Sequence, residues 1–142
     1  MSFYITLSSD SSASFFPENK ISHFSVQLPH SICLDDDEYE VAVCEVFTPK
    51  CDPNADSTPC YLYTDLVKPQ IMSDRSVRLL RILESPSIRN HTIFSALYYI
   101  PVEKRNISTI TLTFATKFGN RYPFPAANIH PSIVILHFRK VI

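Results

Sequence analysis

The stretch Ser108–Thr116, STITLTFAT, decides the fold class of this chain. Apolar residues and threonines alternate along it: Ile110, Leu112 and Phe114 lie between Thr109, Thr111 and Thr113. A period of two indicates a β-strand with one buried face. Threonine is also β-branched, and such residues disfavour a helix because their side chains are stiff beside the preceding turn. We therefore expect a central strand whose apolar side chains belong to the core.

Seven further segments have the length and apolar pattern of strands. They are residues 3–6, 24–28, 39–47, 60–67, 77–83, 92–100 and 132–138. Pro29 and Pro101 are expected to end two of them, because proline cannot donate a ladder hydrogen bond. Gly119, within the sequence FGN, predicts a hairpin. A short helical turn within residues 87–97 is an alternative to part of the sixth strand.

Short strands without a sustained helical period predict an all-β fold. Antiparallel strands joined by polar turns favour a sandwich of two sheets, and the jelly roll is the commonest form with eight strands. We expect a single-domain antiparallel β-sandwich, jelly-roll-like, of about eight strands over residues 1–142. The predicted core consists of Phe24, Val26, Val41, Val43, Ile110, Leu112, Phe114, Val134 and Leu136.

The amino-acid composition limits the kinds of function that this chain can have. Hydrophobic residues make up 45% of the 142 residues, and charged residues only 19%, which is below the typical quarter. A low charged fraction leaves fewer charged side chains for a fully solvated surface, and so it favours a protein whose surface is partly covered by partner proteins. The formal net charge of −1 gives no overall field that attracts nucleic acid or an anionic membrane. The only glycine, Gly119, excludes glycine-rich phosphate-binding loops.

Catalytic and metal-binding patterns are absent from the sequence. No nucleophile elbow occurs, and the four cysteines and five histidines lack zinc-site spacing. We therefore expect no enzyme activity, no cofactor and no metal. A disulfide between Cys51 and Cys60 is one alternative, and free thiols in a reducing compartment are the favoured interpretation. The chain begins without a secretory leader pattern, so we expect it to be made in the cytoplasm.

Polar side chains interrupt two neighbouring apolar runs. Tyr61, Tyr63 and Asp65 alternate along one side of a predicted strand, while Arg78 and Arg81 stand in and beside the next. Turn residues between the runs allow the two strands to fold back on each other. We expect Asp65 to accept hydrogen bonds from Arg78 or Arg81, in a pair that fixes geometry more than it stabilises.

Two residues near the end of the chain complete the candidate interface. His137 lies within the last predicted strand and is interpreted as a hydrogen-bonded core or interface histidine; Arg139 follows it. A nucleic-acid contact is an alternative use of the basic residues. The candidates for that contact are Lys68, Arg75, Arg78, Arg81, Arg89, Arg139 and Lys140.

Several short motifs carry a resemblance to a known family. They are MSFYITLSSDSS at the start, YLYTDLVKPQI, LLRIL, the YIPV box and the closing ILHFRK. With them the chain resembles a family of small β-rich proteins encoded by Polinton (Maverick) elements and adintovirus-like viruses. Those relatives tend to carry a glycine before the aspartate where this chain has Ser73–Asp74, and another glycine near Asn128. Serine and asparagine tolerate tight turns, so we expect these two departures to leave the fold unchanged.

The resemblance implies a structural role in a virus particle, as a minor capsid, penton-like or cement protein. Its expected partners are copies of itself, in a pentamer or trimer, and other capsid proteins, with a weak contact to packaged DNA as an additional partner. No membrane and no small-molecule substrate is expected. Such a protein is located in the virion after assembly inside the host cell. Two alternatives stay open: a monomeric adaptor that binds a protein by an edge strand, and a minor DNA-binding virion protein.

Overall fold

The structure is a computed structural model that describes residues 2–34, 37–51, 58–125 and 130–141. The described part contains strands and connecting turns but no helix, so no helix in it could span a membrane. The first sheet has the order β1-β11-β3-β8, and β9 also pairs with β3. Its strands are β1 (Ser2–Ser8), β3 (Tyr39–Phe47), β8 (His91–Ile93), β9 (Ile100–Pro101) and β11 (Ile133–Lys140).

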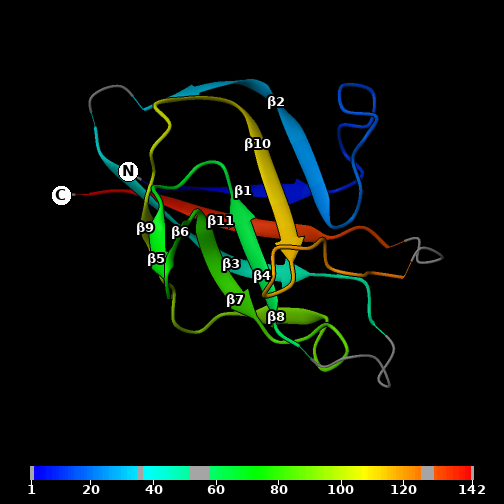
Figure 1. Ribbon diagram of the computed structural model, residues 1–142. Helices are drawn as coiled ribbons and strands as arrows, with labels where there is room; N and C mark the ends of the chain where they lie inside the picture. Colours follow the sequence, from blue (N-terminus) through cyan, green and yellow to red (C-terminus); the bar gives the residue numbers. More distant parts are fainter. Residues whose placement is uncertain (1, 35–36, 52–57, 126–129, 142) are drawn as a thin grey trace.

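The second sheet has the order β2-β10-β4-β7 and lies in front of the first in Figure 1. Its strands are β2 (His23–Cys33), β4 (Cys60–Thr64), β7 (Leu79–Leu83) and β10 (Asn106–Ala115). A separate small hairpin consists of β5 (Gln70–Met72) and β6 (Arg75–Val77). All strand pairs are antiparallel.

The order of pairing identifies the sandwich as a jelly roll. β4 pairs with β7, and then, moving outward along the chain in both directions, β3 pairs with β8, β2 with β10 and β1 with β11. The chain therefore forms one long hairpin whose successive strand pairs alternate between the two sheets, which is the double Greek key of a jelly roll. The expected all-β, antiparallel, jelly-roll-like fold is confirmed.

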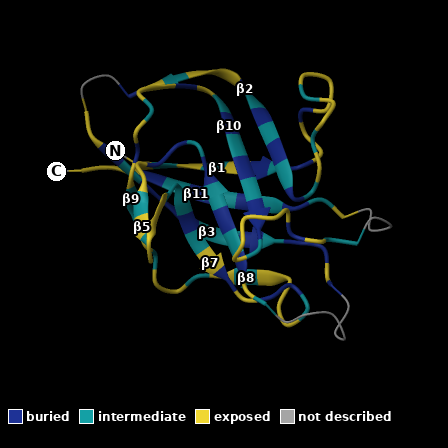
Figure 2. Ribbon diagram, in the orientation of Figure 1, coloured by how far each residue is buried: buried dark blue, intermediate teal, exposed yellow. Residues whose placement is uncertain are grey.

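The core lies between the two sheets, where buried positions alternate with half-buried ones along each strand (Figure 2). All nine residues of the predicted core are buried, and Phe24, Ile110, Leu112 and Phe114 have no exposed surface. Burial of large apolar side chains is the main favourable contribution to such a fold. The period-two pattern of residues 108–116 therefore identified the central strand β10 correctly.

The predicted strand ends differ at several places. The segment 60–67 ends as a strand at Thr64, and the segment 77–83 is divided between β6 and β7. Pro29 does not stop β2, which continues to Cys33. The pairing of β2 with β10 is interrupted between Gln27 and Ile32, so Pro29 lies where no ladder hydrogen bond is needed.

The segment 92–100 is also not one strand, because only its two ends pair with β3, in β8 and β9. The helical alternative holds for a single turn at the start of its range, where Arg89 N–H donates to the Ser85 carbonyl at 3.0 Å. Residues 91–93 are already extended.

Two turns contain a residue with a positive φ. Gly119 has a φ of 85° in the turn after β10, where Gly119 N–H donates to the carbonyl of Thr116. Ser73, between β5 and β6, has a φ of 58°, which is the left-handed region. Ser73, where the resemblance implies a glycine, therefore lies at a position that favours glycine. The other departure, Asn128, lies outside the described residues.

Candidate interaction surfaces

Asp65 lies just beyond the end of β4 and binds a lysine. Lys104 Nζ lies 2.7 Å from Asp65 Oδ2, and the Thr111 backbone N–H donates to Asp65 Oδ1 at 3.0 Å. Asp65 N–H in turn donates to the Thr111 carbonyl at 3.3 Å. The expectation of an arginine partner is therefore wrong. Lys104 reaches the carboxylate from the segment between β9 and β10. The sequence around Asp65 does not indicate this partner.

Arg78 lies in the same region as Asp65 but forms its ion pair with a different acidic residue. Its Nη1 donates to the Val67 carbonyl at 2.7 Å and lies 2.9 Å from Glu103 Oε1. Glu103 N–H also donates to the Leu66 carbonyl at 2.7 Å. The segment Val102–Lys104 therefore supplies both partners, Glu103 to Arg78 and Lys104 to Asp65. Both ion pairs are partly exposed, so each contributes geometry more than stability.

Arg81 stacks between two aromatic rings. Its guanidinium carbon lies 4.0 Å from the ring centre of Phe94 and 3.8 Å from that of Tyr98. Nη1 donates to the Ala96 carbonyl at 2.7 Å. A guanidinium in this position is attracted by the negative faces of both rings. Arg81 therefore holds the connection between β8 and β9 against β7, and this explains why residues 94–99 leave the sheet.

His137 and Arg139 belong to one network on the outer face of the first sheet. Tyr99 Oη lies 2.8 Å from His137 Nδ1, and the Arg139 guanidinium stacks on the Tyr99 ring at 3.5 Å. Arg139 Nε forms an ion pair with Glu40, and the Tyr4 ring packs on His137. Tyr4 is 68% exposed. The structure thus places His137 and Arg139 in one surface cluster, which Tyr99, not named from the sequence, connects.

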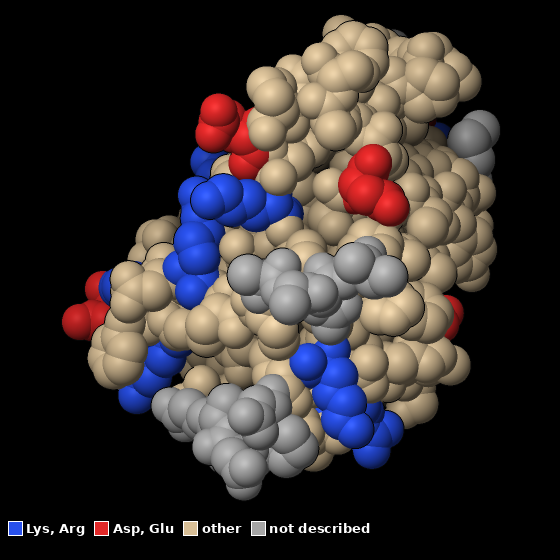
Figure 3. Space-filling model, turned by 90° about the vertical axis from the view of Figure 1, so that its right-hand side faces the viewer, with Lys and Arg blue, Asp and Glu red and all other residues tan. Residues whose placement is uncertain are grey.

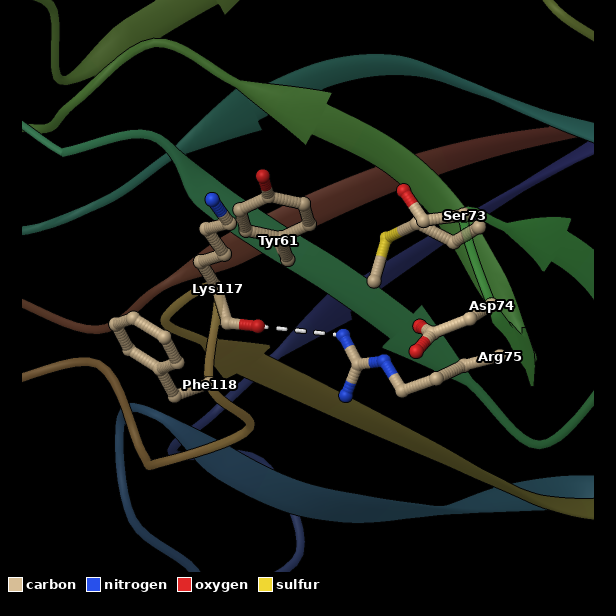
Figure 4. A pocket seen from close by; sticks show the side chains of 7 residues that line it. Tyr61, Ser73, Asp74, Arg75, Lys117 and Phe118 are labelled. Atoms are coloured by element: carbon tan, nitrogen blue, oxygen red, sulfur yellow. Dashed lines mark hydrogen bonds between the residues drawn. The ribbon is translucent and has the colours of Figure 1, made fainter.

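Tyr61 and Tyr63 lie on the outer face of the second sheet, half-buried beside the β5–β6 hairpin. Burial raises the pKa of Tyr63, while the nearby Arg75 guanidinium acts in the opposite direction. Arg75 Nη2 donates to the Lys117 carbonyl at 3.2 Å. A cavity of about 320 Å³ opens between the hairpin and the turn after β10 (Figure 4). Its lining includes Tyr61, Ser73, Asp74, Arg75, Lys117 and Phe118.

The seven predicted interface residues thus do not form one site. Asp65 and Arg78 share the segment 102–104, His137 and Arg139 share Tyr99, and Arg81 has its own aromatic partners. No pattern in the sequence selects Lys104, Glu103 or Tyr99 as partners. Each reaches its partner from a connection whose path depends on the complete fold.

A groove lies between the two edge strands on the opposite side of the sandwich from β7. Among the described strands β1 pairs only with β11, and β2 only with β10. The groove between them has a volume of about 350 Å³, and apolar side chains of Ile5, Val26, Leu28 and Ile32 line it. An edge strand with unpaired backbone groups can accept an additional strand.

Cysteines and metal-binding groups do not form a site in the described ranges. Cys51 and Cys60 are buried free thiols, and burial raises the pKa of both. A thiol with a raised pKa is a poor nucleophile and a poor metal ligand. No group of three His, Cys, Asp or Glu side chains in residues 2–34, 37–51, 58–125 and 130–141 is placed to hold a metal ion.

Comparison with known proteins gives one informative result. No protein-family model matches the sequence, and no curated protein is significantly similar to it. Among solved structures, the chain is similar to the mavirus penton protein, with a TM-score of 0.57 and 8% sequence identity. The similarity covers 99% of this chain and 100% of that one. The two proteins share a fold. At this identity the likeness extends to the fold alone, which is therefore one that a viral penton protein also adopts.

Proposed function

We propose that this protein is a non-enzymatic structural component of a virus particle, formed by one jelly-roll domain over residues 1–142. The observation that carries the proposal is the likeness to a penton protein over the full length of both chains. A fold alone does not determine function. Here, however, the described strands of the two sheets all belong to the jelly roll, and the chain's motifs resemble those of Polinton and adintovirus-like proteins. A penton-like position is favoured over a cement or other minor capsid position.

Assembly with copies of itself and with other capsid proteins is the mechanism of such a function. A pentamer or trimer is favoured, because capsid positions have cyclic symmetry. Large apolar side chains are exposed on the side of β7 and β8, where Ile82, Ile93 and Tyr98 are 48%, 69% and 61% exposed. We place the self-association surface there, beside the Arg81 stack. The mature location is the virion, after synthesis in the host cytoplasm and assembly inside the cell.

Size-exclusion chromatography with light scattering tests this proposal. We expect a discrete oligomer of the purified protein, and Ile93→Asp should shift it towards the monomer. Ile71→Asp is the matched control, since Ile71 is 88% exposed on the β5–β6 hairpin. Purified protein that stays monomeric at every concentration, and that binds no capsid protein co-expressed with it, contradicts the proposal.

A second candidate function is a monomeric adaptor that binds a protein partner by β1. The groove between β1 and β2 favours it, because a peptide strand could pair with the β1 edge and place side chains against Ile5 and Leu28. A monomer that binds an extended peptide, and loses it on Thr6→Pro in β1, would support this candidate instead of the capsid role.

A further inference from the structure

The lysines and arginines of this protein differ in whether an acidic side chain neutralises them. One group is neutralised by acids at 4.0 Å or less and consists of Arg78, Arg89, Lys104, Arg139 and Lys140. Seven other cations are exposed, and no ion pair holds them in the described part of the chain. Three of these, Lys50, Lys68 and Arg105, lie elsewhere in the chain, and the other four lie on backbone segments that pair or bond with one another. We call these four the basic stripe; its members are Lys20, Arg75, Lys117 and Arg121.

Strand pairing places the first half of the stripe in one row. Lys20 and His23 form a β-bridge at the start of β2, and His23 pairs with Thr113 of β10. Ala115, two residues further along β10, forms a bridge with Arg121. The Arg121 charge also reaches His23, whose pKa is lowered by burial and by this neighbour. Lys20 and Arg121 therefore flank His23 and add their positive charges.

The turn after β10 continues the row towards β5 and β6. Lys117 lies in the turn that returns the chain from Ala115 to Arg121. The hydrogen bond from Arg75 to the Lys117 carbonyl joins this turn to the β5–β6 hairpin. Figure 3 faces the right-hand side of the molecule in Figure 1, and Lys and Arg side chains form separate groups on this face, with a few acidic side chains beside them.

Aromatic rings accompany the cations at the end of the stripe. Phe118 is 81% exposed, next to Lys117, and lines the cavity together with Tyr61 and Arg75 (Figure 4). A phenylalanine so exposed in a folded monomer gains little from its position, but it offers a flat apolar face to a ligand. Asp74, at the same cavity, is the acidic side chain that opposes an anion there.

We propose that the basic stripe binds a single-stranded segment of nucleic acid, with phosphates along Lys20, Arg121, Lys117 and Arg75 and a base stacked on Phe118. A row of cations tracks a phosphate backbone, and an aromatic face beside it stacks an unpaired base. A duplex has no unpaired base to offer, and an acidic peptide makes no use of the aromatic ring. The formal net charge of −1 gives no overall attraction to nucleic acid, so the binding depends on the local charges of the stripe.

Fluorescence anisotropy of a labelled oligothymidylate tests the proposal. The probe is longer than ~16 nucleotides, so that it exceeds the largest site size of comparable grooves. Each neutralised phosphate of a single strand contributes about −0.7 to the slope of log K against log salt. Four contacts therefore predict a slope of about −2.8. Lys117→Ala and Arg121→Ala should each reduce its magnitude by about 0.7.

Two further variants separate stacking from charge. Phe118→Ala should weaken binding by roughly tenfold without changing the salt slope, because it removes a stacked base and no cation. Asp74→Asn should strengthen binding, because it removes the opposing carboxylate. Lys140→Ala is the matched control, since Lys140 is an exposed lysine in an ion pair with Asp37. It should leave the affinity unchanged.

Three results would overturn the proposal. The first is no binding at low salt, and the second is equal effects of Lys140→Ala and Lys117→Ala. The third is that poly-glutamate competes as well as unlabelled oligothymidylate while Phe118→Ala keeps the affinity of the parent protein. That result would assign the stripe to an acidic polypeptide. The inference is independent of self-assembly. A monomer that binds the probe supports the nucleic-acid inference and contradicts the capsid role. An oligomer that does not bind the probe contradicts the nucleic-acid inference alone.

Discussion

Asp65 and Lys104 are 39 residues apart in sequence, yet the Lys104 ammonium lies 2.7 Å from the Asp65 carboxylate. The second carboxylate oxygen accepts the Thr111 backbone N–H. β4 ends at Thr64, which pairs with Leu112 of β10. The Asp65 carboxylate therefore takes the place of the next backbone carbonyl in the ladder, and Lys104 compensates its charge. This double use explains an aspartate at the end of a strand.

Substitution of Asp65 should separate these two uses. Asp65→Asn keeps an oxygen acceptor for Thr111 N–H and loses only an ion pair whose side chains are 35% and 34% exposed. We expect it to lower the free energy of unfolding by less than about 1 kcal/mol. Asp65→Ala also leaves the Thr111 N–H without its acceptor and should cost about 1–3 kcal/mol. Urea unfolding measures both, with Lys104→Ala as the control for the ion pair. A large loss in Asp65→Asn contradicts this division.

Leu112 provides the most direct test of the core. It has no exposed surface and lies in β10, at the centre of the second sheet. Leu112→Ala should lower the free energy of unfolding by about 2–5 kcal/mol, because a cavity remains in a packed interior. Ser108→Ala, at an exposed position of the same strand, should change it by no more than about 0.5 kcal/mol. An unchanged melting temperature for Leu112→Ala would show that β10 is not central.

The turn between β5 and β6 carries a strained serine. Ser73 has a φ of 58°, where a residue with a Cβ atom is disfavoured by roughly 1–2 kcal/mol. Ser73→Gly should therefore raise the free energy of unfolding, by about 1 kcal/mol at most after the greater entropy of glycine in the unfolded chain is included. Ser76→Gly, in the adjacent extended strand β6, should lower it instead. Thermal unfolding of the two variants shows whether the shifts are opposite.

Local patterns predicted the parts of this fold that local physics determines. Ile110, Leu112 and Phe114 must lie on one face of any strand, and that face had to be buried. The partner of Asp65 could not be predicted in the same way. Lys104 is supplied by a connection whose position depends on the pairing of β9 with β3.

Residues 94–99 illustrate the same limit. Their apolar pattern predicts a strand, but Phe94 and Tyr98 stack on Arg81. That contact competes with strand pairing only after β7 is in place. The basic stripe was likewise not predicted as a unit, because each of its four cations stands alone in the sequence. Of the candidates for a nucleic-acid contact, only Arg75 belongs to it.

His23 should make stability depend on pH. Burial and the Arg121 charge lower its pKa in the folded state, so the unfolded chain binds the proton more tightly. Stability from this group is complete above about pH 6.5, the ordinary pKa of histidine, and falls as the pH drops below it. The loss of unfolding free energy between about pH 7.5 and 5.5 should be smaller in His23→Gln. Arg121→Gln should raise the pKa of His23 in an NMR titration. A His23 pKa above the ordinary value would contradict the assignment.

Arg81 should be required for its planar shape and not for its charge alone. Arg81→Lys keeps a cation but cannot stack between Phe94 and Tyr98 while donating to the Ala96 carbonyl. We expect a loss of about 1–2 kcal/mol in unfolding free energy, from two partly exposed cation–π contacts. Hydrogen exchange should become faster in residues 94–99 and stay unchanged in β10. Arg89→Lys is the matched control, because Arg89 has only a 3.5 Å ion pair with Glu84. Since Tyr98 lies on the proposed self-association surface, Arg81→Lys should also weaken the oligomer. Equal stability, hydrogen exchange and assembly in Arg81→Lys and Arg89→Lys would show that Arg81 serves only as a surface charge.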